Sequence, residues 1–266
     1  MQKTLFPEHD ENRMTFKDHF SATAAGYVRF RPRYPEALFD YLAGEAPRRE
    51  RAWDCATGSG QAAIGLAKHF ERVIATDASA GQIAHALPNP RVDYRVAPAE
   101  KSGLEPESVD LVTVAQALHW FDIPAFFQEV KRVLTPGGLL AVWCYQLFTI
   151  DPAIDRIVLR FYTETVGRYW PPERKMIEEG YRSISFPSAF TELRTPSFSL
   201  ESPLTLDQFG GFLQTWSAVQ RCNKEMGRDP VAPLLAELAP LWGDLKRPRM
   251  LRYPLPLRMG RKEEGP

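Results

Sequence analysis

The chain lacks the cysteine pairs, the excess of one charge and the long apolar runs that mark several common protein classes. Its three cysteines, Cys55, Cys144 and Cys222, are far apart and odd in number, so they predict neither a disulfide framework nor a zinc-binding motif. No group of histidine, cysteine and acidic residues has metal-ligand spacing, and we therefore expect no metal. Unpaired cysteines are typical of a reducing compartment, and we expect a cytoplasmic protein.

Two further absences concern partners. Lysine and arginine balance aspartate and glutamate at 33 each, so the net charge is zero and the basic footprint of a nucleic-acid-binding protein is missing. No apolar run approaches the roughly 18 residues of a membrane span, and we expect no membrane partner. The N-terminal residues 1–13 are polar and lack the apolar core of a signal peptide.

What is present is the length and composition of one α/β domain with a sizeable core. Of the 266 residues, 44% are apolar and 25% are charged, which is ordinary globular usage. We expect residues 1–13 to form a disordered tail and residues 14–260 to form a single domain. Its core would be residues 35–147, and residues 151–260 would complete the sheet and add a cap.

Strand-like and helix-like segments alternate between residues 51 and 145. The continuous apolar run Val109–Ala115 is typical of a strand buried on both faces. The alternation predicts a Rossmann-like, doubly wound, mostly parallel α/β sheet with helices on both faces. The expected strands are 51–55, 73–76, 92–96, 109–115 and 139–145, and the expected helices are 61–70, 79–86 and 123–134, the last stopped by Pro136-Gly137-Gly138.

The C-terminal half is less regular. Strand candidates near 191–200 and 251–259 predict an antiparallel pair that completes a seven-stranded sheet. Helical segments at 152–166, 206–218 and 231–241 predict a helical cap over the ligand site.

A glycine-rich turn, Asp54-Cys55-Ala56-Thr57-Gly58-Ser59-Gly60, follows the first strand. Glycines there allow a sharp turn and a close approach of the backbone to a ligand. A dinucleotide would place its pyrophosphate on the adjacent helix N-terminus, and the spacing Gly58-x-Gly60-x-x-Ala63 fits that option loosely. The Asp54 carboxylate would repel phosphates but would suit the ammonium group of a methionine moiety near a sulfonium. Charge complementarity therefore favours S-adenosylmethionine over NAD.

Polar residues also follow the next three strands. Asp77 ends the second strand, where an acid can accept hydrogen bonds from ribose hydroxyls. Ala99-Glu100 follows the third strand and could contact the adenine edge, and Gln116 follows the fourth strand near the expected switch point. Each acid alone could be a solvated turn residue, but the ordered set indicates a cofactor site.

These motifs resemble those of the class I S-adenosylmethionine-dependent methyltransferases of the type-11 domain group. They look closest to the branch that includes the trans-aconitate methyltransferases. The resemblance covers residues from about 16 to 145 and rests on Asp54–Gly60, Thr76–Ser79, Ala99-Glu100, Ser108–Val112, Ala117–Phe121, Arg132–Gly138 and the upstream element Phe20…Tyr27…Arg31–Pro35.

The resemblance implies a methyltransferase domain and a set of cofactor-binding residues. Asp54, Gly58 and Gly60 would hold the methionine end, Asp77 the ribose and Glu100 the adenine side. Tyr27 and Arg31 would come from an N-terminal segment that folds over the cofactor and reaches its carboxylate. The remaining residues of the implied set are Ala56, Ala78, Ala99 and Gln116. Ala56 departs from the family, which has glycine there, and an alanine is unstrained only if its φ is negative.

The expected reaction is transfer of a methyl group to a small-molecule acceptor. Transfer from a sulfonium is an in-line displacement, so the protein mainly aligns the reactants and excludes water. A carboxylate acceptor, which is one option, would need no base, and Arg33 could orient it while Tyr34 lines the pocket. His119 is the candidate catalytic residue, either as general base or as a hydrogen-bonding group for the substrate, and a purely structural role is the alternative.

Three other functions compete with this interpretation. An NAD-dependent oxidoreductase would share the fold and part of the glycine spacing, but the sequence offers no evident acid/base pair for hydride transfer. A non-catalytic regulatory protein would bind the cofactor without a methyl acceptor. A nucleic-acid methyltransferase would carry an Asn/Asp-Pro-Pro-Tyr/Phe stretch where Gln116–His119 stands.

Overall fold

The structure is a computed structural model that describes residues 32–264. The predicted tail of residues 1–13, and Tyr27 and Arg31 of the predicted site, lie outside the described residues. Within residues 32–264, no helix is long and apolar enough to cross a membrane.

The main sheet has seven strands in the order β3-β2-β1-β4-β5-β9-β6. The first five strands are parallel to one another, and β9 is antiparallel to both β5 and β6. This arrangement confirms the prediction of a mostly parallel, seven-stranded, Rossmann-like α/β sheet. The strands are β1 (Arg51–Cys55), β2 (Arg72–Asp77), β3 (Val92–Val96), β4 (Val109–Ala115), β5 (Leu134–Trp143), β6 (Phe190–Leu193) and β9 (Leu257–Lys262).

Helices cover both faces of this sheet because neighbouring residues of a strand point to opposite faces. In β4, Leu111 packs in the cluster that contains α2 (Glu36–Glu45) and α3 (Gln61–Leu66). The next residue, Val112, packs in the cluster that contains α5 (Ile123–Val133) and the buried end of α7 (Arg174–Glu178). The short helix α4 (Ala80–Ala84) follows β2 and buries no side chain.

The beginning of β5 differs from the prediction. The segment Pro136-Gly137-Gly138, predicted to stop the preceding helix, lies inside β5, which begins directly after α5 and ends at Trp143. The register against β4 shifts between the pairs Val109–Leu134 and Leu111–Leu139. The extra residues form a bulge, and Gly137 adopts the left-handed φ of +73° that the bulge requires.

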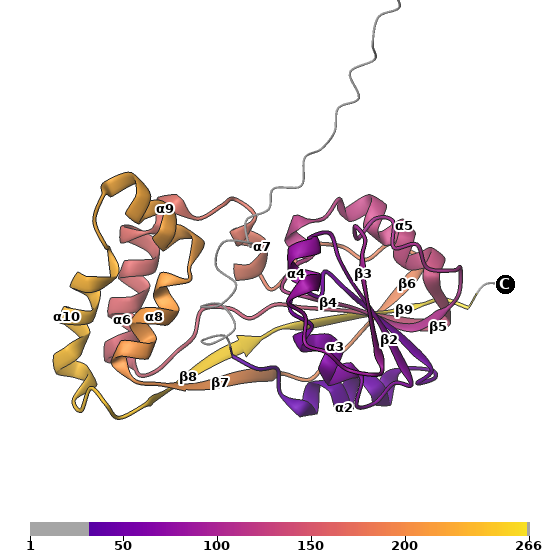
Figure 1. Ribbon diagram of the computed structural model, residues 1–266, viewed down its shortest axis with the longest axis horizontal. Helices are drawn as coiled ribbons and strands as arrows, with labels where there is room; N and C mark the ends of the chain where they lie inside the picture. The colour runs from indigo at the N-terminus through magenta and orange to yellow at the C-terminus, as the bar shows by residue number, and fades with distance from the viewer. Residues whose placement is uncertain (1–31, 265–266) are drawn as a thin grey trace, which may run out of the picture.

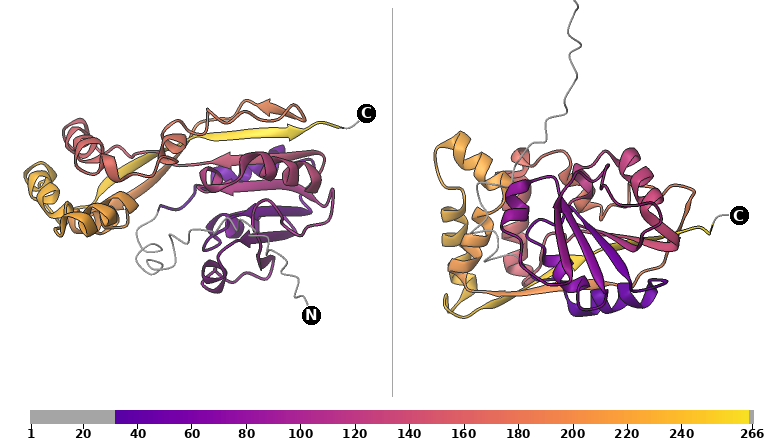
Figure 2. Two further views of the ribbon diagram at one scale, coloured as in Figure 1. Left: turned by 90° about the horizontal axis from the view of Figure 1, so that it is seen from above. Right: turned by 45° about the vertical axis from the view of Figure 1, so that its right-hand side comes forward.

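The predicted antiparallel pair is divided between two sheets. The 191–200 region gives β6 in the main sheet and β7 (Phe198–Leu204) outside it, and the 251–259 region gives β8 (Arg249–Leu255) and β9. The pair β7–β8 forms a separate two-stranded ribbon. Only Pro256 separates β8 from β9, so the two strands form one extended band (Figures 1 and 2).

The remaining helices form a group at the far end of this ribbon, beyond the carboxyl end of β5 (Figure 1). The chain leaves β5 and runs beside β8, where the Gln146 N–H donates to the Pro254 carbonyl at 3.0 Å. The predicted helix 206–218 is two helices separated by Thr215 and Trp216. This helical group consists of α6 (Pro152–Arg160), η2 (Phe161–Thr165), η3 (Gly167–Tyr169), α8 (Leu206–Gln214), α9 (Ser217–Met226) and α10 (Val231–Trp242), and we call it the cap.

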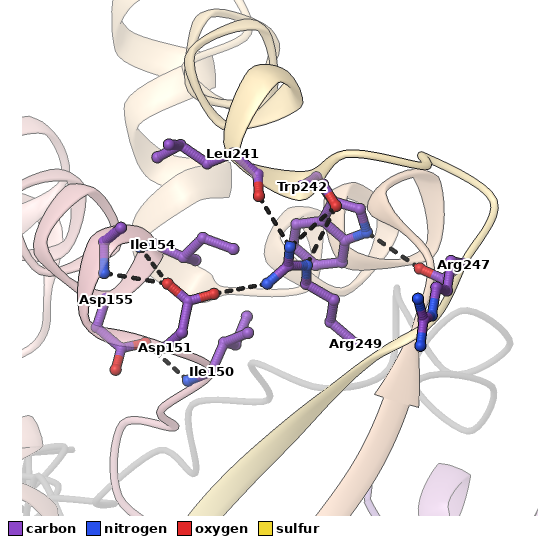
Figure 3. Close-up of polar contacts among 9 residues, drawn as sticks. Ile150, Asp151, Ile154, Asp155, Leu241, Trp242, Arg247 and Arg249 are labelled. Carbon is purple, nitrogen blue, oxygen red and sulfur yellow. Dashed lines mark hydrogen bonds and ion pairs between the residues drawn. The ribbon is translucent and has the colours of Figure 1, made fainter.

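Arg249, the first residue of β8, joins two helices of the cap (Figure 3). Its Nη1 donates to Asp151 Oδ2 at 2.6 Å, while Asp151 Oδ1 accepts from the Ile154 N–H at 3.1 Å and so caps the N-terminus of α6. Nη2 donates to the carbonyls of Leu241 and Trp242 at 2.9 and 3.1 Å, at the C-terminus of α10. One guanidinium therefore satisfies groups at two helix ends that would otherwise lack partners.

We predict that Arg249→Ala lowers the free energy of unfolding by about 1–3 kcal/mol, because it leaves partly buried carbonyls and a carboxylate without their donor. Both partners of the ion pair are only about a third exposed, with side-chain exposures of 34% and 32%. Arg252→Ala is the matched control on the same strand, since its pair with Glu201 is 58% and 53% exposed and should contribute less than about 1 kcal/mol. Equal losses in urea denaturation would contradict this interpretation.

Candidate functional site

Asp54 is fully buried near the end of β1. Its Oδ1 accepts from the Thr113 hydroxyl of β4 at 2.8 Å, and its Oδ2 accepts from the Thr57 hydroxyl of the turn at 2.5 Å. Burial raises the pKa of Asp54 to about 6, although these hydrogen bonds and one from the Ala63 backbone act in the opposite direction. The carboxylate is therefore mostly ionised at pH 7 and becomes protonated below pH 6.

The glycine-rich turn after β1 contains three left-handed residues. Ala56 has a φ of +54°, Gly58 of +55° and Gly60 of +85°. The condition for an unstrained alanine is not met at position 56: the residue keeps the left-handed conformation that glycine would have, which costs an L-residue about 1–2 kcal/mol. At Gly60 a Cβ would overlap the side chain of Tyr94, so both the turn and the packing require glycine.

Asp77 ends β2 and faces the same turn. Its Oδ2 accepts from the Gly58 N–H at 2.9 Å, and its Oδ1 accepts from the Ser79 N–H at 2.9 Å. The charge of Asp77 also contributes to the raised pKa of Asp54, so the two acids are close enough to interact. Ala78, which follows Asp77 in the sequence, is exposed. Two carboxylates at one turn favour a cationic ligand and oppose a diphosphate.

The loop after β3 approaches the same edge. The Ala97 N–H donates to the Asp77 carbonyl at 3.0 Å. Ala99 is buried, and Glu100 Oε1 accepts from the Asp122 N–H at 3.0 Å, at the start of α5. The predicted adenine-side residues are thus held between β2 and α5.

Gln116 follows β4 with a φ of +60°, which is strained for a residue with a Cβ. Its Nε2 donates to the Tyr145 carbonyl at 3.4 Å, but within residues 32–264 its buried Oε1 has no hydrogen-bond partner. The buried Trp143 Nε1, at the end of the neighbouring strand β5, also has none. A buried polar atom without a hydrogen-bond partner costs about 1–3 kcal/mol. Two such atoms at neighbouring strand ends, one of them on a residue with a strained backbone, indicate a ligand site.

Tyr34 lies at this edge, and Arg33 does not contact it. The Tyr34 ring meets the Trp143 ring edge to face, with centroids 5.5 Å apart. The Tyr34 N–H donates to Gln61 Oε1 at 3.2 Å, at the start of the helix that follows the glycine-rich turn. Arg33 is exposed and makes no hydrogen bond or ion pair in the described part of the chain.

His119 lies on the short helix η1 (Leu118–Trp120) and is 8% exposed. Its Nδ1 is 3.0 Å from the hydroxyl oxygen of Tyr181. Burial, with a smaller contribution from the positive charge of Arg174, lowers the pKa of His119 to about 3. The imidazole is therefore neutral at physiological pH and is a weak base, which favours the hydrogen-bonding role over the general-base role among those predicted.

An arginine in an aromatic cluster lies near His119 and was not predicted. Arg174 lies over the Trp170 ring at 4.6 Å, and its Nε donates to the Tyr162 hydroxyl at 2.8 Å. Trp216 completes the cluster, with its ring 5.5 Å from that of Trp170. Helix α7, which carries Arg174, packs against η1. No motif or spacing in the sequence indicated that Arg174 and Trp216 would meet in one cluster.

A cavity among the described residues lies elsewhere. It has a volume of about 630 Å³ and is open at the amino ends of β1, β2 and β3, where exposed residues of both charges line it, including Arg51, Arg72 and Glu105. Ligands of open α/β sheets bind at the carboxyl ends of the strands, so this cavity is separate from the candidate site. Within residues 32–264, no cluster of histidine, cysteine and acidic residues could hold a metal ion.

The residues at the carboxyl edge fit S-adenosylmethionine. Two carboxylates, Asp54 and Asp77, suit a cation and ribose hydroxyls, and the turn excludes a Cβ at Gly60. Gln116 offers an unsatisfied acceptor. The predicted residues Asp54, Ala56, Gly58, Gly60, Asp77 and Gln116 come together at this edge, with Ala78, Ala99 and Glu100 beside them.

Comparisons with known proteins agree with this fit. The sequence profile of a family described as a methyltransferase domain matches residues 53–142. A Dictyostelium discoideum protein named as a candidate methyltransferase is 38% identical over 226 residues, covering 84% of this chain and 85% of the relative. A Saccharomyces cerevisiae protein named as a candidate S-adenosylmethionine-dependent methyltransferase is 28% identical over 249 residues, covering 81% and 84%.

A solved structure agrees as well. An Anaeromyxobacter dehalogenans protein, described as a candidate type II methyltransferase, is 47% identical and superimposes with a TM-score of 0.84. The match covers 89% of this chain and 100% of that structure.

We predict that the affinity for S-adenosylmethionine weakens about tenfold when the pH falls from 7 to 5. The pKa of Asp54 is about 6, and protonation below that value removes a negative charge that attracts the cationic ligand. Calorimetric titration at several pH values would measure the dissociation constant. Asp54→Asn, which cannot ionise, should bind more weakly at pH 7 and show little change in this range. Equally tight binding by the native protein at pH 5 and pH 7 would contradict the prediction.

Proposed function

The chain belongs to the class I S-adenosylmethionine-dependent methyltransferases, and we propose that it transfers the methyl group to the carboxylate of a small-molecule acceptor. It is accordingly an enzyme, and S-adenosylmethionine is its cofactor. Family membership removes the support for the NAD-dependent alternative. The trans-aconitate branch stays a prediction.

The proposal of a carboxylate acceptor rests on the hydrogen bonding of the Arg174 guanidinium. Its guanidinium is half-buried against Trp170 and Tyr162, and only Nε donates a hydrogen bond within residues 32–264. Glu178, on the same helix, accepts instead from the Tyr162 hydroxyl. The two terminal nitrogens of Arg174 therefore remain available as a planar fork, which matches a carboxylate in bidentate geometry.

The surroundings of Arg174 also suit an anionic acceptor. Its charge lowers the pKa of His119 and also acts to lower that of Cys144, whose pKa burial raises to about 12. These groups are therefore within electrostatic reach of one another. Trp170 and Trp216 provide apolar walls that would lower the effective dielectric around an ion pair.

A carboxylate acceptor is consistent with the lack of a strong base. When bound, the cofactor supplies an electrophilic methyl group on a sulfonium. Asp54, Asp77 and the glycine-rich turn would hold the cofactor, and Arg174 would orient an acceptor that is already ionised at neutral pH. His119, whose pKa is about 3, has no proton to remove in such a reaction. Arg33 remains the second candidate for the acceptor carboxylate.

We predict that Arg174→Gln raises KM for the acceptor about 10- to 100-fold and leaves the cofactor affinity unchanged, because charge-assisted hydrogen bonds contribute about 1.5–3 kcal/mol. Isotopically labelled S-adenosylmethionine incubated with the protein and a metabolite extract would identify the product by mass spectrometry. Arg33→Gln, tested in parallel, compares the two arginines directly.

The chemical stability of the labelled product tests the acceptor group. A methyl ester releases its label in mild alkali, whereas an N-methyl or C-methyl product keeps it. An alkali-stable product would rule out the carboxylate acceptor while leaving the methyltransferase assignment intact.

A further inference from the structure

We infer that Tyr181 fixes His119 in the tautomer that carries its proton on Nε2, so that the imidazole is a hydrogen-bond donor to the methyl acceptor. Tyr181 is then a positioning residue of the site. The contact with the acceptor rests on the proposed function, whereas the tautomer does not.

Tyr181 is held in place by its backbone and its burial. It is fully buried, and its φ of +60° follows a φ of +61° at Gly180. A Cβ at Gly180 would press against Pro256, so glycine is required at position 180. The Tyr181 ring lies roughly parallel to that of His119, with the centroids 6.1 Å apart. A non-glycine residue in this conformation persists only where its surroundings demand it.

The tautomer follows from counting protons. A phenol has one proton, and the one acceptor that it reaches within residues 32–264 is Nδ1 of His119, at 3.0 Å. If His119 carried its proton on Nδ1, the buried hydroxyl proton would have no acceptor, which costs about 1–3 kcal/mol. Tyr181 therefore donates to Nδ1. A neutral imidazole has one N–H group, so the His119 proton is on Nε2.

The environment of the Tyr181 oxygen supports this direction. Burial raises the pKa of Tyr181 well above its usual value, so the hydroxyl keeps its proton. The hydroxyl therefore has a proton to donate, and the Nδ1 atom of His119, 3.0 Å away, is the acceptor that receives it.

The resulting Nε2–H group is available for a ligand. In the described part of the chain, His119 Nε2 makes no hydrogen bond. The low pKa keeps the ring neutral, so it donates without gaining a charge. The segment 174–181 thus supplies the Arg174 guanidinium at the first residue of α7 and the Tyr181 hydroxyl after that helix, and both favour an acceptor with anionic oxygen atoms.

The tautomer is measurable on the full-length protein without any substrate. Two-dimensional ¹H–¹⁵N multiple-bond spectra of histidine-labelled protein distinguish Nδ1–H from Nε2–H imidazoles, and His119→Gln assigns the His119 signals by their loss. We expect Nε2–H in the native protein between pH 5 and 8, and a mixture of tautomers in Tyr181→Phe. An Nδ1–H tautomer in the native protein, or an unchanged tautomer in a folded Tyr181→Phe, would overturn the inference.

Activity provides the second measurement. With the labelled cofactor and the metabolite extract, Tyr181→Phe should lower methyl transfer about tenfold, the equivalent of one hydrogen bond, without changing the affinity for S-adenosylmethionine. Tyr169→Phe is the matched control: this buried phenol lies in the cap, where its hydroxyl bonds to Arg168 and Glu225, and its loss should alter neither rate nor tautomer. An unchanged rate in Tyr181→Phe would overturn the positioning role.

The two proposals fail in different ways. If the extract yields no methylated product, the proposed acceptor class is wrong, while the spectra still decide the tautomer. If Tyr181→Phe does not fold, the native tautomer alone decides, because only the Nε2–H form is compatible with the proton count.

Discussion

The buried carboxylate of Asp54 is the constraint on which the site depends. Removing a charge from water is costly unless polar groups replace the lost hydration. Here Thr113 of β4 and Thr57 of the turn provide those hydrogen bonds, and they tie the turn to the sheet in doing so. Together with Asp77, the carboxylate makes this edge of the sheet negative. The requirement for a cationic ligand is therefore part of the packing of the central strands.

Much of the core was predictable because local sequence and tertiary position agree there. The bounds of β1, β3 and β4 match the predicted segments 51–55, 92–96 and 109–115. The beginning of β5 was not predictable, because a Pro-Gly-Gly sequence ends a helix or forms a bulge with equal ease, and only pairing with β4 decides between them. The division of the last strands at Pro256 likewise depends on which partners they find.

The residues of the candidate site were likewise predictable where local sequence fixes their position and unpredictable where tertiary packing does. Asp54, Asp77 and Gln116 were predictable because each ends a parallel strand, and such ends meet at one edge. Tyr181 and Arg174 were not predictable, because they come near His119 through the packing of α7 against η1. No periodic pattern in the sequence indicates that contact. The φ of Ala56 could not be predicted from the sequence, because it depends on how the turn folds against β2, where the Thr57 N–H donates to the Thr76 carbonyl at 2.9 Å.

The nearly continuous course of β8 into β9 has a consequence for the position of the cap relative to the main sheet. One strand belongs to both the ribbon and the main sheet, so the cap has no loop on that side about which to swing. Pro256 between them has a fixed φ, which stiffens the junction. The length of this strand sets the distance between the cap and the main sheet, and each added residue would increase that distance by about 3.3 Å.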